Sequence, residues 1–195
     1  MFGRFLSILK DLVRFFSGTG SSGASPEKRP SESRLDSTAE EWRREVLSLG
    51  LPPVFADVWD DRVPSVLVAW RRPDTFLRRR ADLLRYLPRL ACCVPLCQEF
   101  GDTLFAYDRE SDEFVACHFA LGEPPYLEKM GDSYQRFVAA YLVDCVYAGE
   151  ERLEEIAAIL NFSHLKTILT FAEQEDDDLD PDQAKQQLVA SIPKN

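Results

Sequence analysis

The sequence lacks the excess of basic residues that general binding to nucleic acids requires. Its 23 lysines and arginines are outnumbered by 33 aspartates and glutamates, which gives a formal net charge of −10. Because a protein that neutralises phosphates needs a basic surface, this balance argues against a nucleic-acid partner. Cysteine is scarce as well: the 5 cysteines are odd in number and lie mostly within apolar runs. That usage favours free thiols over disulfides and predicts a cytoplasmic protein.

The motifs of common catalytic and metal sites are also missing. The chain has no glycine-rich phosphate loop, no nucleophile elbow, no His-x-x-x-His pair and no Cys-x-x-Cys pair, so we expect no cofactor and no metal. Cys117 and His118 are adjacent on a predicted strand, where neighbouring side chains point to opposite faces, so they cannot act on each other. The sequence leaves open a thiolate–imidazole pair between His118 and either Cys97 or Cys145. Together these absences favour a protein that is not an enzyme.

What the sequence does contain, at its start, is an amphipathic helical pattern over residues 1–17. The segment is too short and too interrupted by charges to span a bilayer about 30 Å thick. Basic residues opposite Phe and Leu are instead typical of a helix that lies on anionic lipid. The alternatives are docking on its own domain or on a partner, and a cleaved organelle presequence. The predicted docking residues are Phe2, Phe5, Leu9, Leu12 and Phe16 on the apolar side and the basic residues Arg4, Lys10 and Arg14.

The stretch over residues 18–38 is rich in Gly, Ser and Pro. This composition predicts a flexible linker that tethers the amino-terminal helix to the rest of the chain. The first helix of the globular domain is expected to begin near Thr38, where Ser and Thr precede two glutamates, and to end at Gly50.

We expect one globular domain over residues 39–172. Apolar runs over residues 94–108 and 114–119 predict consecutive antiparallel strands, and a helix is predicted over residues 74–86. The expected fold is therefore α+β, with a central, mostly antiparallel sheet flanked by helices. Residues 173–195 are expected to form an acidic tail with a short helix.

Seven arginines stand against two aspartates in residues 71–89. At helical spacing, Arg78, Arg85 and Arg89 share one face. This face is either an ordinary solvated one, with Asp82 pairing with Arg78 or Arg85, or a basic patch for an acidic protein partner or lipid headgroups.

An acidic loop over residues 108–113 is a second candidate for contact with a partner. Asp108 and Asp112 are the residues that a partner would meet there. The alternative is an ordinary hairpin loop, because such loops are polar by default.

Four short motifs occur in a distinctive order along the domain. A Leu-Pro step at Leu51–Pro52 follows the first helix, and an apolar-Pro-apolar step at 94–96 opens a strand. A Gly-Asp pair at Gly101–Asp102 leads into the next strand, and Ser-Tyr-x-x-Phe at 133–137 begins a helix. This order, over residues 40–145, resembles the SMI1/KNR4 family of the SUKH superfamily.

The chain departs from that family at residues 60–64, where a common Gly-Gly step is replaced by Asp-Asp-Arg-Val-Pro. The resemblance implies a protein-binding module: either an immunity protein that occludes a toxin domain or a regulatory adaptor. An acidic surface would suit a basic nuclease toxin through electrostatic steering. The competing expectation is a peripheral membrane protein, held at the inner membrane face by its amino-terminal helix.

Overall fold

The structure is a computed structural model that describes the backbone of residues 32–120, 122–173 and 180–194, and side chains from residue 39 onward. The predicted amino-terminal helix, with all its docking residues, lies outside these ranges. None of the helices in the described ranges is both long and apolar enough to cross a membrane.

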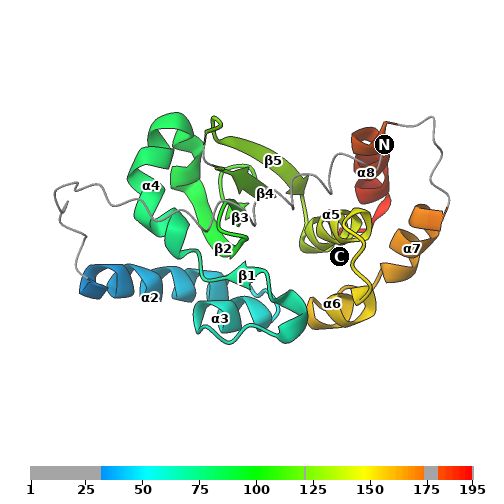
Figure 1. The fold of residues 1–195 in the computed structure, drawn as a ribbon, viewed down its shortest axis with the longest axis horizontal. Helices are drawn as coiled ribbons and strands as arrows, with labels where there is room; N and C mark the ends of the chain where they lie inside the picture. Colours follow the sequence, from blue (N-terminus) through cyan, green and yellow to red (C-terminus); the bar gives the residue numbers. More distant parts are fainter. Residues whose placement is uncertain (1–31, 121, 174–179, 195) are drawn as a thin grey trace, which may run out of the picture. The chain divides into compact units, whose positions relative to one another are not determined.

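A five-stranded sheet forms the centre of the domain (Figure 1). Its strands lie side by side in the order of the chain, and each neighbouring pair is antiparallel. This confirms the α+β fold with an antiparallel central sheet. The strands are β1 (Trp70–Arg71), β2 (Cys93–Glu99), β3 (Thr103–Asp108), β4 (Glu113–His118) and β5 (Tyr126–Gly131).

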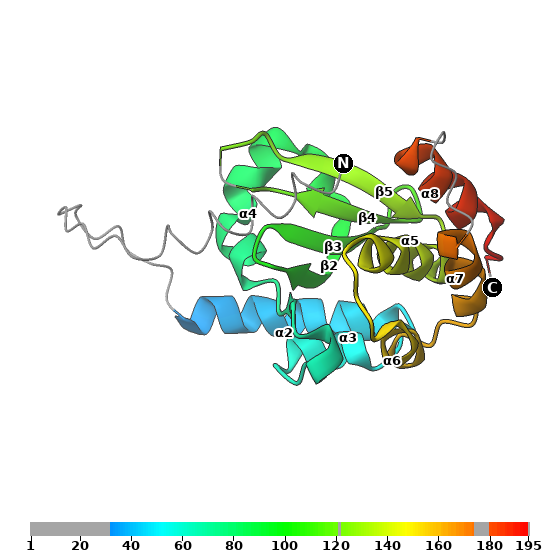
Figure 2. The ribbon, with the colours of Figure 1, turned by 45° about the vertical axis from the view of Figure 1, so that its right-hand side comes forward.

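Helices cover both faces of the sheet. Helix α4 (Asp74–Tyr86) lies on one face and helix α5 (Tyr134–Tyr147) on the other (Figure 2). Neighbouring side chains of a strand point to opposite faces, so Phe105 packs on the α5 side while Leu104 packs on the α4 side. Burial on both faces explains why the central strands are apolar along most of their length.

The turn between β5 and α5 is fixed by a glycine and a helix cap. A Cβ atom at Gly131 would lie 2.7 Å from the Cβ of Arg136, so no larger residue fits without a shift. Ser133 caps α5 as the sequence predicts, because its side chain accepts a hydrogen bond of 3.4 Å from the Arg136 amide.

Helices α2 (Glu32–Ser48) and α3 (Val54–Trp59) pack beside β2. Helix α2 begins earlier than expected, and residues 32–38 are helical although the sequence assigned them to the linker. The reason is that no Pro or Gly interrupts the chain between Pro30 and Gly50.

Three helices complete the domain: α6 (Leu153–Ile159), α7 (Leu165–Glu173) and α8 (Pro181–Ser191). The last is the short helix expected in the tail, and Asp180 caps it by accepting hydrogen bonds from two backbone amides. It packs on α5, where the Arg136 guanidinium donates to the carbonyl oxygens of Ala190 and Ile192 over 2.7 and 2.8 Å. The helix expected in a separate tail is therefore part of the domain.

Candidate functional site

A groove of about 460 Å³ lies beside β1, the edge strand of the sheet. Its size falls in the range of ligand-binding clefts. The groove is bordered by the loop that follows α3, by β1, by the first turns of α4 and by the turn between β2 and β3. Three arginines line it, Arg71, Arg72 and Arg78, and so do the apolar residues Val63, Pro64 and Val68.

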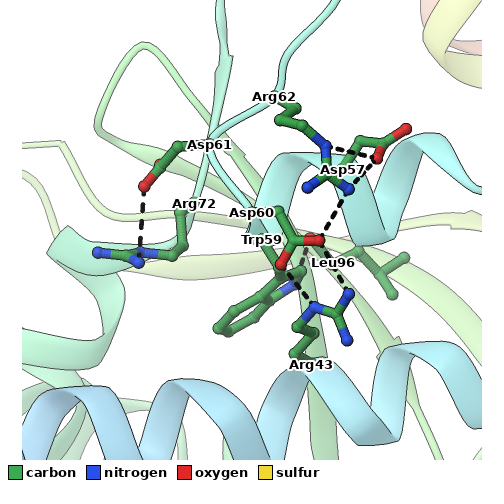
Figure 3. Close-up of polar contacts among 8 residues, drawn as sticks. All are labelled: Arg43, Asp57, Trp59, Asp60, Asp61, Arg62, Arg72 and Leu96. Carbon is green, nitrogen blue, oxygen red and sulfur yellow. Dashed lines mark hydrogen bonds and ion pairs between the residues drawn. The ribbon is translucent and has the colours of Figure 1, made fainter.

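The loop on one side of the groove is held by a network of ion pairs (Figure 3). Asp60, at the end of α3, accepts hydrogen bonds from the Nε and Nη2 atoms of Arg43 over 2.6 and 2.8 Å. Arg62 donates to Asp60 over 2.9 Å and to Asp57 over 2.7 Å. The Arg43 hydrogen bond lowers the pKa of the Asp60 carboxyl. Helices α2 and α3 are thereby joined at the point where the loop begins.

Three further contacts fix the ends of this loop. The indole N–H of Trp59 donates to the carbonyl of Leu96 on β2 over 3.0 Å. At the other end, Arg72 pairs with Asp61 at 3.6 Å (Figure 3). Arg72 also pairs with Asp74 at 2.8 Å. Because these contacts connect α3, β1, β2 and α4, the groove is a preformed feature of the domain.

Arg71 and Arg78 differ from Arg72 in their surroundings. Both side chains are exposed, and neither makes an ion pair within the described residues. Arg72 is instead occupied by Asp61 and Asp74, the two carboxylates of the groove lining. The groove therefore presents two guanidinium groups without a carboxylate partner in the described part of the chain.

The three arginines predicted to share one face have separate surroundings. Arg78 lines the groove, whereas Arg85 pairs with Asp82 at 3.4 Å, one of the pairings expected from the sequence. Arg89 lies beyond the end of α4, in the short helix η2 (Pro88–Cys92), and binds Asp108. Helix α4 ends at Tyr86, so helical spacing does not extend to Arg89.

The structure corrects the assignment of Asp108 to a partner surface. Its side chain is fully buried, with 0% exposure. Burial acts to raise the pKa of its carboxyl, but the Glu110 amide and the Arg89 guanidinium outweigh this effect and lower the pKa. Asp112 is exposed as expected and accepts a hydrogen bond from the hydroxyl of Tyr107. Asp108 is thus a structural residue of the hairpin.

The most exposed aromatic side chain beside the groove is one that the sequence analysis missed. Phe100, in the turn between β2 and β3, is 80% exposed and has a φ of 49°. Gly101 follows with a φ of 92°, and the Asp102 amide donates to the Glu99 carbonyl over 3.3 Å. Two successive positive φ values define the type I′ turn, whose first position favours Asn, Asp or Gly. Phenylalanine is costly at such a position, and its exposure recovers no burial energy.

A second apolar side chain lies close to this turn. Val68, which follows the short helix η1 (Ser65–Leu67) and lines the groove, is 68% exposed. The amide of Phe100 donates to the carbonyl of Ala69 over 3.4 Å, which holds the turn against this segment. We refer to Phe100 and Val68 as the apolar rim of the groove.

A row of polar side chains crosses the same end of the sheet. Glu99, Thr103, His118 and Tyr126 are successive neighbours on β2, β3, β4 and β5. The His118 ring hydrogen-bonds Thr103 at 3.3 Å and Glu128 at 3.1 Å, and it stacks on Tyr126 with ring centroids 4.7 Å apart. The hydroxyl of Thr103, the imidazole of His118 and the carboxylate of Glu128 are therefore connected by hydrogen bonds. The Thr103 hydroxyl also donates a hydrogen bond to the carboxylate of Asp102.

The cysteines do not supply a nucleophile for His118. All five thiols are free, and burial raises the pKa of Cys117 to about 11 and that of Cys145 to about 12. A reactive cysteine needs the opposite shift, toward the thiolate. Neither Cys97 nor Cys145 hydrogen-bonds His118 in the described ranges, where we also find no group of three His, Cys, Asp or Glu residues able to hold a metal ion. That the chain is not an enzyme stays a prediction.

No family model matches this chain, and neither the curated proteins nor the solved structures include a significant match to it.

Proposed function

We propose that the chain is a non-catalytic protein-binding module whose partner docks on the groove and its apolar rim. The observation that carries this proposal is Phe100. A bulky residue in a left-handed backbone conformation costs on the order of 1–3 kcal/mol. Packing among the described residues does not offset that cost, because 80% of the side chain is in solvent. Exposed aromatic residues beside a cleft are the anchors that protein interfaces use most.

The resemblance to the SMI1/KNR4 family supports the same class of function. It favours an immunity protein that occludes a toxin domain, with a regulatory adaptor as the other version. In either case the module acts by covering or holding a partner, which needs a rigid surface and no reactive group. The groove meets that need, since ion pairs and sheet pairing hold the elements that border it.

Site-specific crosslinking tests the proposal. A photoreactive phenylalanine replaces Phe100 in the full chain, and a matched variant carries it at Tyr86, which is 70% exposed on α4. Both variants are illuminated in cells of the source organism. We expect a discrete protein adduct from position 100 and none from position 86. The absence of an adduct at position 100, or the same adducts from both positions, would contradict the proposal.

A second candidate function is attachment to a membrane surface. The amphipathic pattern of residues 1–17 favours it, with Phe and Leu on one side and basic residues on the other. This function involves a different part of the chain and is compatible with partner binding by the domain, since a linker separates the two in the sequence. Flotation of the full chain with anionic lipid vesicles tests it.

A further inference from the structure

We infer that the partner contributes an acidic, extended segment to the groove, with an apolar side chain placed against Phe100 and Val68. This inference rests on the proposed function and names the chemistry of the partner. Three observations lead to it: the arginines that lack a carboxylate, a buried amide that points toward the groove, and the apolar rim.

The charges of the groove favour an anion. Arg72 pairs with both Asp61 and Asp74, and the three arginines of the lining outnumber its two carboxylates. Arg71 and Arg78 have no such partner among the described residues. Guanidinium groups bind carboxylates through paired, charge-assisted hydrogen bonds. The chain as a whole carries a net charge of −10, so this basic groove is a local exception to an acidic protein.

Gln98 supplies an independent observation. Its side chain is only 3% exposed and lines the groove. The Oε1 atom accepts a hydrogen bond of 3.2 Å from the Phe76 amide, which identifies the other terminal atom as the NH₂ group. This nitrogen lies toward Gly101, which also lines the groove, and it has no partner within the described residues. Because Arg80 Nε is the one buried side-chain polar atom without a partner in the described residues, the Gln98 NH₂ group is open to the solvent of the groove, where a ligand oxygen can accept a hydrogen bond from it.

The three donors belong to one site. Arg71 and Gln98 are direct neighbours across β1 and β2, and Arg78 lies on α4 above the same groove. All of them donate hydrogen bonds, so the complementary ligand is rich in acceptors. Glutamate and aspartate side chains match this requirement, whereas a basic or amide-rich segment would leave the guanidinium groups unpaired.

The apolar rim distinguishes a protein segment from a free anion. A small carboxylate or phosphate would use the donors and leave Phe100 and Val68 in solvent. A segment that alternates acidic and apolar residues buries the rim and pairs the donors at once. The groove also runs beside the edge strand β1, where an extended chain fits the direction of the sheet.

Selection from a random peptide library tests the inference without knowledge of the partner. Peptides displayed on phage are selected on the full chain, and the enriched ones are measured by fluorescence anisotropy. We expect enrichment of Asp and Glu around one apolar residue. Affinity should fall by about tenfold or more in the Arg71→Gln/Arg78→Gln variant. The control variant, Arg44→Gln/Arg85→Gln, has the same change of charge at exposed positions outside the groove and should keep its affinity.

The selection would overturn the inference if it gave no enriched peptide, enriched peptides that are not acidic, or acidic peptides that bind both variants equally. Free glutamate and inorganic phosphate serve as competitors. If either displaces the peptide as well as the peptide displaces itself, the groove binds a small anion and the inference is wrong. An adduct from position 100 alongside non-acidic peptides would leave the proposed function standing and remove only this inference.

Discussion

The indole N–H of Trp70 donates a hydrogen bond to the hydroxyl of Tyr141 over 3.0 Å, although 71 positions separate the two residues. The contact joins the edge strand β1 to α5 under the groove. The Tyr141 hydroxyl in turn donates to Glu99 at 3.4 Å. Replacing Tyr141 with Phe removes the acceptor and leaves the buried indole N–H unpaired, so we expect a loss of about 1–3 kcal/mol in the free energy of unfolding. Urea denaturation measures it, and a Tyr86→Phe variant, at a 70% exposed position on α4, is the control. An equal loss in both variants would contradict the assigned role.

Glu99 makes stability depend on pH. Burial raises the pKa of its carboxyl to about 7, and the Tyr141 hydrogen bond opposes that rise only in part. A raised pKa means that the folded state binds the proton more tightly than the unfolded state does. The contribution of this group to stability is therefore complete below about pH 4.5 and is lost as the pH rises to about 7.

A Glu99→Gln variant isolates this effect. It cannot ionise, so it should be more stable than the native chain at about pH 8, by on the order of 2 kcal/mol. At about pH 5 the two proteins should differ much less. Urea denaturation at both pH values gives the comparison. A constant difference between the proteins across this range would show that Glu99 does not titrate there.

The buried Asp108 and the exposed Asp112 provide a matched pair of substitutions. Asp108→Asn weakens the contact with Arg89, and we expect it to lower the free energy of unfolding by about 2 kcal/mol. Asp112→Asn alters a solvent-exposed carboxylate and should change stability by less than about 0.5 kcal/mol. Thermal unfolding followed by circular dichroism measures both. Equal stability of the two variants would show that the Arg89 contact contributes little.

The network around Asp60 should be weaker and sensitive to salt. Asp60 is partly exposed and lies between two guanidinium groups. We expect Asp60→Asn to cost about 1 kcal/mol at low ionic strength and less at high ionic strength. A double-mutant cycle with Arg43→Gln measures the coupling between the two residues. A coupling of zero at low salt would mean that the pair does not hold α2 to α3.

Membrane attachment is tested on the full chain by flotation with anionic lipid vesicles. We expect the native chain to float and a Phe5→Asp/Leu9→Asp variant to remain in the lower fraction, because the changes place charges on the apolar side of the predicted helix. The control is Leu47→Asp/Val68→Asp, which adds the same charge at exposed apolar positions of the domain. Flotation of the first variant together with the native chain would exclude an anchoring role for residues 1–17.

The sequence predicted the regular parts of this fold because their signals are local. The apolar runs over residues 94–108 and 114–119 mark the central strands, and Ser133 marks the start of α5. Residues 32–38 were assigned to the linker because of their composition. They contain no Pro or Gly to end a helix, and α2 includes them. The packing of α8 on α5 depends on contacts between distant residues, which periodicity does not reveal.

The candidate site was harder to predict, for related reasons. Phe100 follows a strand of buried residues, so an apolar residue there is expected to be buried as well; its backbone conformation depends on the turn that Gly101 completes. Asp108 is acidic and adjoins a loop, yet Arg89 approaches it from η2 and buries it. Arg78 was predicted to share a face with Arg85 and Arg89, whereas the structure places it in the lining of the groove, apart from both. Gln98 carries no sequence signal, because its unpaired amide results from the fold.

The left-handed turn at Phe100 has a consequence for any attempt to make this protein more heat-resistant. Asparagine at this position suits the backbone better, so Phe100→Asn should raise the free energy of unfolding by about 1 kcal/mol. A screen that rewards thermostability alone would therefore select the change that removes the proposed anchor. We expect phenylalanine to be kept at position 100 only when the screen also requires partner binding. That result would show that position 100 trades thermostability for recognition of the partner.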